Sequence, residues 1–453
     1  MRDYAFILFL LGMFGCGVRR PFVFVLVYIY IDLVSPQRLT YLLLNSIPIS
    51  LIAVGLAVGG WIVADNKQGT RLAPRQALMI ALLAYCAVST RTADFPVEAL
   101  EKWDWAWKAL AFAIFLPFTL RTRLRIEALL AFMILSAASI IIVGGIKTLF
   151  SGGGYGALNL MVTNNTGLYE GSIISTVAIA IIPLIWWFAK HGTIFPPDRR
   201  VTLFCLALTF ACLLIPIGTV ARTGLVCIAV LALLTLRAVK RRLLYLTLFA
   251  AIGLTAIPFL PDTYTQRMGT IGGYQGDASA STRLAVWQWT WDYVQDHPFG
   301  GGFEAYRQNR IRYDTVKVEG DGTGQAVVRD LQVDQARAYH SSYFEMLGEQ
   351  GFPGLALWLM IQIGGLFRME VLRRRYLKAE GDEAWVAPLA TALQHCHLIY
   401  LIGGAFVGIA LNPFLYLILG AQIGLDTYLS RRRAGASAKP MGSKPKPQLA
   451  MQG

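Results

Sequence analysis

A series of long apolar blocks along the whole chain limits the possible folds more than any other feature. Of the 453 residues, 55% are hydrophobic and 15% are charged, and the apolar residues are contiguous rather than arranged as one helical stripe. A membrane-spanning helix needs about 20 predominantly apolar residues, because that length crosses the hydrocarbon core of a bilayer. The pattern therefore predicts an all-α polytopic membrane protein and excludes a soluble domain.

The apolar blocks predict about 12, possibly 13, transmembrane helices. Several blocks are shorter than a full crossing requires, and the first fits either a crossing or a shallow insertion. The amino terminus lacks the basic region and the cleavage site of a signal peptide, so we expect it to be retained. The approximate blocks are 4–18, 22–35, 41–64, 77–90, 105–120, 127–147, 171–190, 201–218, 223–236, 243–260, 342–367, 387–410 and 412–428.

The distribution of lysine and arginine predicts the orientation. One alternating set of segments holds 26 of the 41 basic residues, whereas the other set holds seven in its short segments and eight in one long loop. Positive residues in short loops mark the cytoplasmic side, so the long loop is predicted to be periplasmic. The predicted division is 1–260 for the first ten or so helices, 261–340 for the large periplasmic loop, 341–430 for the C-terminal transmembrane helices and 431–453 for a disordered cytoplasmic tail.

The net charge of +14 reflects mostly the excess of lysine and arginine in the segments predicted to be cytoplasmic. The long loop carries ten acidic and eight basic residues, so it is not a nucleic-acid-binding patch, and membrane lipids are the expected surroundings. All six cysteines lie in or beside apolar blocks, which excludes a disulfide framework in the loop. No CxxC, P-loop or DxD pattern occurs, and His395 and His397 face different sides of a helix, where we expect packing or an interhelical polar contact. The sequence predicts no metal site and no cofactor.

Arg222 is the only charged residue between positions 201 and 236, in the stretch "IPIGTVARTGLV" at a predicted outward turn. An arginine at the membrane interface is costly and usually has a functional partner. Anchoring of a helix end in lipid headgroups explains this residue equally well.

The long loop contains a predicted interfacial helix. In "ASTRLAVWQWTWDYVQDHP", the side chains of Leu284, Trp287, Trp291 and Val294 recur at helical spacing, and Arg283 lies near the start. Helix amino termini and arginines both favour anions. The glycines that follow in "DHPFGGGF" allow a tight backbone path, and His297 beside them is predicted to be a structural cap.

His340 lies where the loop re-enters the membrane, in "ARAYHSSYFEMLGEQGFPG". Aromatic and apolar residues at spacings of three and four predict a helix from about Tyr339 until Gly351 and Pro353 stop or kink it. A lone histidine is more often structural than catalytic. His340 is predicted to lie at the same membrane depth as the outward-facing Arg222 and Arg283, and this shared depth favours a functional role.

Three motifs in this order resemble the O-antigen ligase superfamily, which includes O-antigen ligases, O-antigen polymerases and protein O-oligosaccharyltransferases. They are "ARTG" after an apolar helix, "STRLAVWQWTWDYVQDHPFGGGF", and "HSSYFEMLGEQGFPGL". The first 150 residues also resemble a subgroup described as O-glycosylation ligases. The resemblance covers most of the chain.

The resemblance implies transfer of a glycan from undecaprenyl pyrophosphate to an acceptor hydroxyl outside the bacterial inner membrane. It places the essential histidine at His340 and the two essential arginines at Arg222 and Arg283. In a ligase the acceptor is a sugar of lipid A-core, and this is the predicted function, without a metal and with inversion at the anomeric carbon. The alternatives are a protein O-oligosaccharyltransferase, an O-antigen polymerase or, in a different class, a lipid-linked sugar transporter.

Overall fold

The computed structural model describes residues 2–40, 44, 46–150, 168–238, 241, 242, 244, 247, 278–319 and 326–437. The predicted block 243–260 and the first part of the long loop lie largely or wholly outside these residues. The final helix continues to Ser437, past the predicted boundary at 430. The rest of the predicted tail, 438–453, lies outside the described residues.

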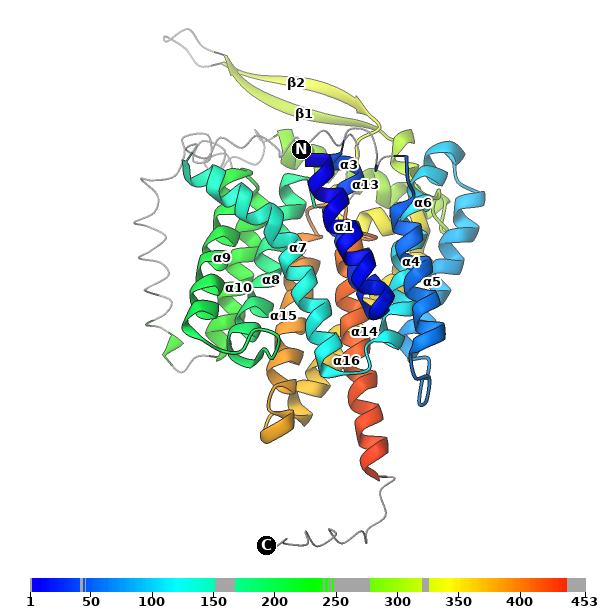
Figure 1. The fold of residues 1–453 in the computed structure, drawn as a ribbon. Coiled ribbons are helices and arrows are strands. Elements are labelled where there is room, and N and C mark those ends of the chain that lie inside the picture. Colours follow the sequence, from blue (N-terminus) through cyan, green and yellow to red (C-terminus); the bar gives the residue numbers. More distant parts are fainter. Residues whose placement is uncertain are drawn as a thin grey trace, which may run out of the picture.

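The described chain is a bundle of helices that run in alternating directions between two ends (Figure 1). One end, here called the hairpin end, carries α13, β1, β2 and the amino terminus; the opposite, tail end carries the carboxy-terminal end of α16. The helices are α1 (Arg2–Arg19), α2 (Phe22–Val34), α3 (Pro36–Leu39), α4 (Ile49–Ala64), α5 (Pro74–Arg91), α6 (Pro96–Thr119), α7 (Arg123–Phe150), α8 (Gly171–His191), α9 (Arg199–Gly218), α10 (Arg222–Ala238), α13 (Ala278–Asp296), α14 (Ser342–Arg375), α15 (Val386–Gly403) and α16 (Pro413–Ser437), with short 3-10 helices at η3 (Ala305–Gln308) and η4 (Gly381–Glu383).

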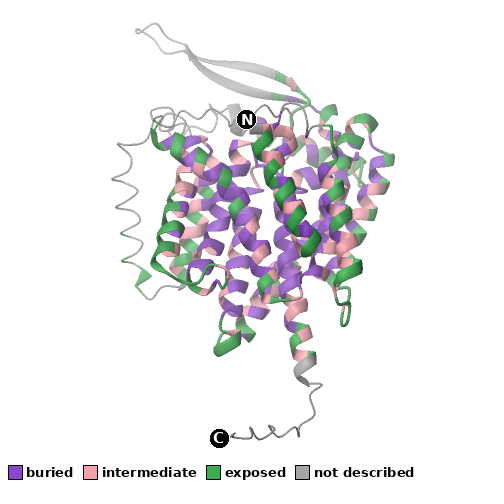
Figure 2. Cartoon of the chain, in the orientation of Figure 1, coloured by how far each residue is buried: buried purple, intermediate pink, exposed green. Residues whose placement is uncertain are grey.

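The structure is that of a multi-pass helical membrane protein. Five stretches of the described chain contain helices long and apolar enough to cross a bilayer: α7, α8, α9, α14 and 381–403, which includes α15. The apolar helices α2 and α4 are shorter, and the prediction of twelve or thirteen crossings stays a prediction. Buried residues fill the centre of the bundle, whereas exposed apolar side chains lie on its outside, as expected where lipid is the solvent (Figure 2).

An antiparallel hairpin of β1 (Arg310–Glu319) and β2 (Ala326–Gln335) lies in the long loop. Its register pairs Arg310 with Gln335 and Glu319 with Ala326. The sequence analysis predicted only helix in this loop, so the hairpin is an addition to the predicted all-α fold. The alternating β-branched and charged residues of "RIRYDTVKVE" and "AVVRDLQVDQ" are the pattern that could have revealed it.

Helix α14 bends at Gly351, as the Gly-Phe-Pro-Gly stretch predicted. Gly351 has φ 63° and ψ −169°, and Pro353 lacks an N–H, so the carbonyls of the preceding turn lose their helical partners. The glycine-rich stretch that begins at Pro298 replaces these partners. Its amides bond the freed carbonyls, with Gly301 N to Gly348 O at 3.1 Å and Gly302 N to Glu349 O at 2.9 Å; in return, Phe352 N donates to Pro298 O at 3.0 Å.

Helix α15 ends at Gly403, although the apolar block continues to position 410. Residues 404–412 instead form a non-helical segment packed inside the bundle beside α14. Its backbone is bonded by protein groups: the hydroxyl of Tyr400 donates to Ile409 O at 3.3 Å, and the indole of Trp358 donates to Ala410 O at 3.1 Å. Irregular backbone is stable at membrane depth only where protein or water satisfies it in this way.

Candidate functional site

His340 lies at the hairpin end, one residue before Ser341, which is the N-cap of α14. The helix was predicted to begin at about Tyr339, so its predicted start is about one turn too early. His340 has φ 48° and Ala336 has φ 54°, both in the left-handed region that non-glycine residues rarely adopt. Such a conformation persists only where neighbouring groups impose it, and it is commonest at functional sites.

Two side chains hold the segment 336–340 in this conformation. Asn309 is fully buried and bonds the backbone of Arg337 twice, accepting from its N–H at 2.9 Å and donating to its carbonyl at 2.7 Å. The indole of Trp287 donates to Tyr339 O at 2.9 Å and stacks on Phe344, with ring centroids 5.0 Å apart. These contacts fix the backbone on both sides of Tyr339, and so the position of His340.

Arg283 reaches the same place from α13. Within the described part of this helix, buried residues recur every four positions, so they form one face that packs against the protein. They are Thr282, Val286, Thr290 and Val294. Leu284 and Trp291 are about half exposed, so part of the predicted apolar face is open to its surroundings. Trp287, by contrast, packs toward α14. Arg283 is one turn before Trp287 and lies close enough to His340 to act on its charge.

The electrostatics around His340 favour a neutral imidazole. The surrounding protein removes water from the imidazole and so disfavours its charged form, which lowers the pKa of His340 below its ordinary value. The positive charges of Arg283 and Arg337 lower this pKa further. A neutral histidine has an unprotonated nitrogen, which is the requirement for a proton acceptor near neutral pH. Arg337 was not singled out from the sequence; it is largely exposed and pairs with Asp334 at 2.7 Å.

Arg222 begins α10 after a tight turn in which Val220 has φ 51°. The turn joins α8 through the hydroxyls of Thr219 and Ser175, which are 2.8 Å apart. At the same level, Gly403 packs on Thr176 of α8, and the next residue, Gly404, accepts the N–H of Ser342 at 2.7 Å. The half-buried Arg222 thus lies at about the depth of His340, at the start of α10, which packs on α8 and α15. Of the two arginines predicted from the sequence, Arg283 is the one whose charge acts on His340.

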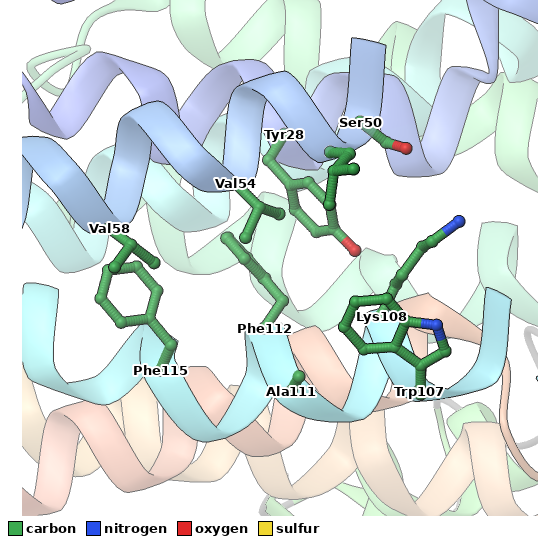
Figure 3. Close-up of a pocket in the computed structure, with 10 residues that line it drawn as sticks. Tyr28, Ser50, Val54, Val58, Trp107, Lys108, Ala111, Phe112 and Phe115 are labelled. Carbon is green, nitrogen blue, oxygen red and sulfur yellow. The ribbon is translucent and has the colours of Figure 1, made fainter. Parts of the chain in front are cut away.

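Three other polar candidates have separate places. His297 follows α13 and bonds Tyr293 O at 3.1 Å, which fits the predicted structural cap. His397 bonds Gln362 on α14 and Gln422 on α16, as expected of an interhelical polar contact. Lys108 pairs with Asp104 at 2.9 Å and lines an apolar cavity of about 130 Å³ whose walls come from α2, α4 and α6 alone (Figure 3). Within the described residues, no group of three His, Cys, Asp or Glu side chains is placed to hold a metal ion.

Comparison with known protein families gives two matches. Residues 206–359 match the family model described as "O-Antigen ligase", a stretch that contains Arg222, Arg283 and His340. Residues 1–193 match a family of unknown function, DUF5935. No curated protein matches the chain.

Proposed function

We propose that this chain, of which residues 206–359 match the family model described as "O-Antigen ligase", transfers a glycan from undecaprenyl pyrophosphate to a sugar hydroxyl of lipid A-core, at the periplasmic face of the bacterial inner membrane. The observation that carries the proposal is that the positive charge of Arg283 lies near His340 at one end of a membrane bundle, within the residues that match the family model. A base beside a cation suits a reaction in which a hydroxyl loses a proton and a leaving group gains negative charge.

The arginines are proposed to bind the pyrophosphate. Cleavage of the bond between the anomeric carbon and the phosphate oxygen leaves negative charge on the leaving group. A guanidinium can hold two phosphate oxygens at once and stabilises that charge as it grows. Arg283 would act near His340, and Arg222 would act from the turn between α9 and α10.

His340 is proposed to accept the proton of the attacking hydroxyl. Its lowered pKa keeps the imidazole neutral, and the bonds to the backbone around it fix its place relative to Arg283. Attack on the face opposite the leaving group would invert the anomeric configuration. No nucleotide enters the reaction, because the lipid pyrophosphate already activates the donor.

Metal independence is part of the proposal, since two arginines can supply the charge stabilisation that a divalent ion gives in other transferases. Purified protein should keep its activity in EDTA. Loss of activity in the chelator, with recovery on addition of Mg²⁺ or Mn²⁺, would contradict this.

A membrane-resident acceptor is supported by the site's position at the junction between the loop and the bundle. Exposed Trp291 and Leu284 on α13 suit contact with lipid headgroups, so an acceptor anchored in the outer leaflet could approach His340 laterally. A polymerase of this superfamily typically has two sizeable periplasmic loops, whereas this sequence has one. A protein acceptor also fits one loop and remains the main alternative.

The decisive experiment is reconstitution of the purified chain with donor and separate acceptors. A lipid A-core product that forms only with both substrates supports the ligase. Lengthened glycans from donor alone would indicate a polymerase, and glycosylated protein would indicate an oligosaccharyltransferase. Movement of donor across vesicles without any product would indicate a transporter.

Orientation can be tested independently by cysteine labelling. Gln295 is exposed at the end of α13, and Cys16 is the one exposed native cysteine among the six. In a Cys16→Ser background, Gln295→Cys should react with a membrane-impermeant thiol reagent in cells whose outer membrane admits it. Labelling only after the inner membrane is permeabilised would overturn the periplasmic placement.

A further inference from the structure

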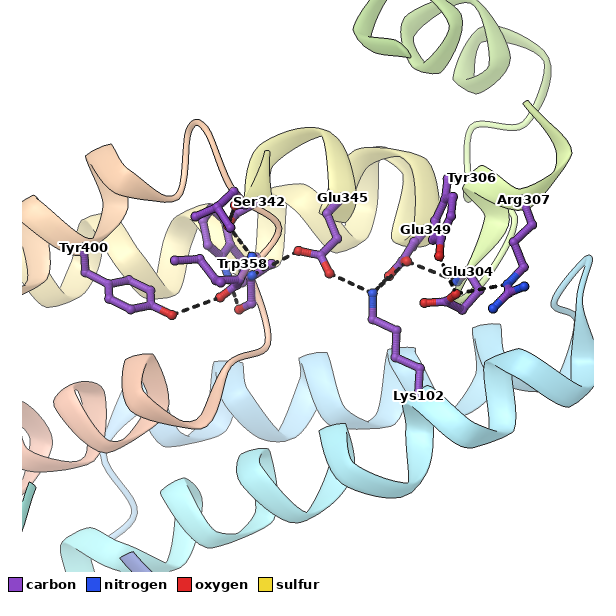
Figure 4. A network of polar contacts seen from close by, with 12 residues as sticks. Lys102, Glu304, Tyr306, Arg307, Ser342, Glu345, Glu349, Trp358 and Tyr400 are labelled. Carbon is purple, nitrogen blue, oxygen red and sulfur yellow. Dashed lines mark hydrogen bonds and ion pairs between the residues drawn. The ribbon is translucent and has the colours of Figure 1, made fainter. Parts of the chain in front are cut away.

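A buried charged cluster lies beneath the segment that carries His340. Lys102 of α6 donates to Glu345 at 2.7 Å and to both oxygens of Glu349 at 2.8 and 2.9 Å, the two carboxylates belonging to successive turns of α14 (Figure 4). The three side chains are 10%, 9% and 1% exposed. Buried charges are costly and need full pairing, so a cluster of this kind requires an explanation.

Each carboxylate also holds a segment that is not a regular helix. Glu345 accepts the N–H of Ala410 at 3.1 Å, which fixes the 404–412 segment. Glu349 accepts the N–H of Glu304 at 3.1 Å, which fixes the end of the glycine-rich stretch. Lys102 therefore links α6, both turns of α14 and two irregular segments through one ammonium group.

The same two segments bound the start of α14. Ser342 donates its N–H to Gly404 O, its hydroxyl bonds Val407 O at 2.9 Å, and that hydroxyl accepts from Ile409 N at 3.0 Å. The glycine-rich stretch continues into η3 and Asn309, which holds the backbone of Arg337. His340 lies between these two attachments, five residues before Glu345.

We propose that Lys102 is a positioning residue for the transfer reaction: its bridge between Glu345 and Glu349 sets the place of His340 relative to Arg283. The inference rests on the proposed function. Displacement of a reacting group by about 1 Å can reduce the rate about 100-fold without contact between the changed residue and the substrate. The competing explanation is that Lys102 only neutralises buried carboxylates and stabilises the fold.

Two variants separate these explanations in purified protein. Lys102→Met removes the ammonium group and leaves two adjacent buried carboxylates. Lys102→Met/Glu349→Gln restores the cluster's original formal charge and keeps an acceptor oxygen for Glu304 N, but it lacks the bridge. Lys108→Met is the matched control, because Lys108 lies on the same helix and its ion pair with Asp104 is partly exposed. Thermal midpoint, kcat and KM for donor are measured for each variant.

If Lys102 positions His340, the double variant regains thermal stability, yet its kcat stays roughly 10-fold to 100-fold below wild type while KM changes little. Lys108→Met should retain wild-type kcat. Recovery of both stability and kcat in the double variant would overturn the proposal, as would wild-type kcat in Lys102→Met. Either result requires an active wild-type enzyme, so it is distinct from a failure of the proposed function, in which wild type forms no product.

If neither variant gives folded protein, Lys102→Arg decides. It retains the charge and can bridge both carboxylates, but its longer, planar group cannot reproduce the same geometry. A reduced kcat with unchanged KM in folded Lys102→Arg supports positioning. A wild-type kcat shows that charge alone is needed and overturns the proposal.

Discussion

Two of the buried polar clusters in the described bundle lie toward opposite ends, and they differ in what they connect. Toward the hairpin end, Lys102 and two glutamates bond to the backbone of irregular segments. Toward the tail end, His397 bonds two glutamine side chains from neighbouring helices, at 2.9 Å to Gln362 and 3.1 Å to Gln422. Arg75 extends this second cluster from α5 by donating to Gln422 at 3.1 Å.

The difference supports the hairpin end as the place of the proposed chemistry. The cluster around His397 joins residues within regular helix by side-chain bonds, an arrangement that fixes helix packing. The cluster around Lys102 holds backbone segments that are not helical and that lead to His340. We therefore expect changes near the hairpin end to alter turnover and changes near the tail end to alter stability.

The largest effect is expected for His340→Ala. Loss of a general base reduces turnover about 100-fold to 10,000-fold, and the exposed position of His340 implies little loss of stability. Arg283→Ala should be similarly severe through lost contact with the leaving group. Turnover is measured on detergent-purified protein with defined donor and acceptor. Near-wild-type turnover of His340→Ala would show that His340 is structural. The expectation that changes at the hairpin end alter turnover, and changes at the tail end alter stability, would then fail.

A stability effect without a turnover effect is expected for His397→Leu. Removal of the imidazole takes away the bonds that it makes with the Gln362 side-chain oxygen and the Gln422 side-chain nitrogen, and each unsatisfied buried group costs about 1–3 kcal/mol. The thermal midpoint should fall, while kcat per folded molecule stays at the wild-type value. His395→Leu, two residues away on the same helix, is the control and should change neither. A large loss of kcat in His397→Leu would contradict the division of roles.

The sequence predicted the helical membrane class, the bend at Gly351 and the helix that carries Arg283, because hydropathy, proline and glycine act locally. It did not predict that Lys102, 243 positions before Glu345, lies buried beside it. Hydropathy counts Lys102 as a polar residue near a helix end, and only the packing of α6 on the loop and α14 reveals its partners. For the same reason the apolar residues 404–410 were included in a helix.

The position of His340 shows the same limit. Spacing alone extended the helix back to Tyr339, whereas the N-cap at Ser341 and the bonds from Asn309 and Trp287 end it earlier. These bonds come from residues 28 and 52 positions away from the residues whose backbone they hold. Local periodicity carries no information about such contacts.

A smaller effect on turnover is expected for Trp287→Phe. Phenylalanine keeps the ring against Phe344 but lacks the N–H that bonds Tyr339 O. A single neutral hydrogen bond contributes about 1 kcal/mol, so kcat should fall about 5-fold while the thermal midpoint changes little. Trp289→Phe is the matched control on the same helix, since its ring stacks on Tyr293 instead. An equal loss of kcat in both variants would show that the bond to Tyr339 has no special role.

The smallest expected effect is a displacement of the pH profile in Arg337→Gln. In the proposed mechanism neutral His340 is the active form, so kcat should fall as the pH drops through the pKa of His340, which the surrounding protein, Arg283 and Arg337 hold below its ordinary value. Removal of the Arg337 charge raises that pKa, and the acidic limb of the kcat profile should move to higher pH. The displacement is small because Arg337 and its partner Asp334 are both accessible to solvent, which screens their charges. Asp334→Asn should move the limb the opposite way, because it removes one negative charge beside Arg337, and Arg337→Lys should leave the limb in place. A limb that does not respond to these three changes would show that a group other than His340 controls the acidic loss of activity.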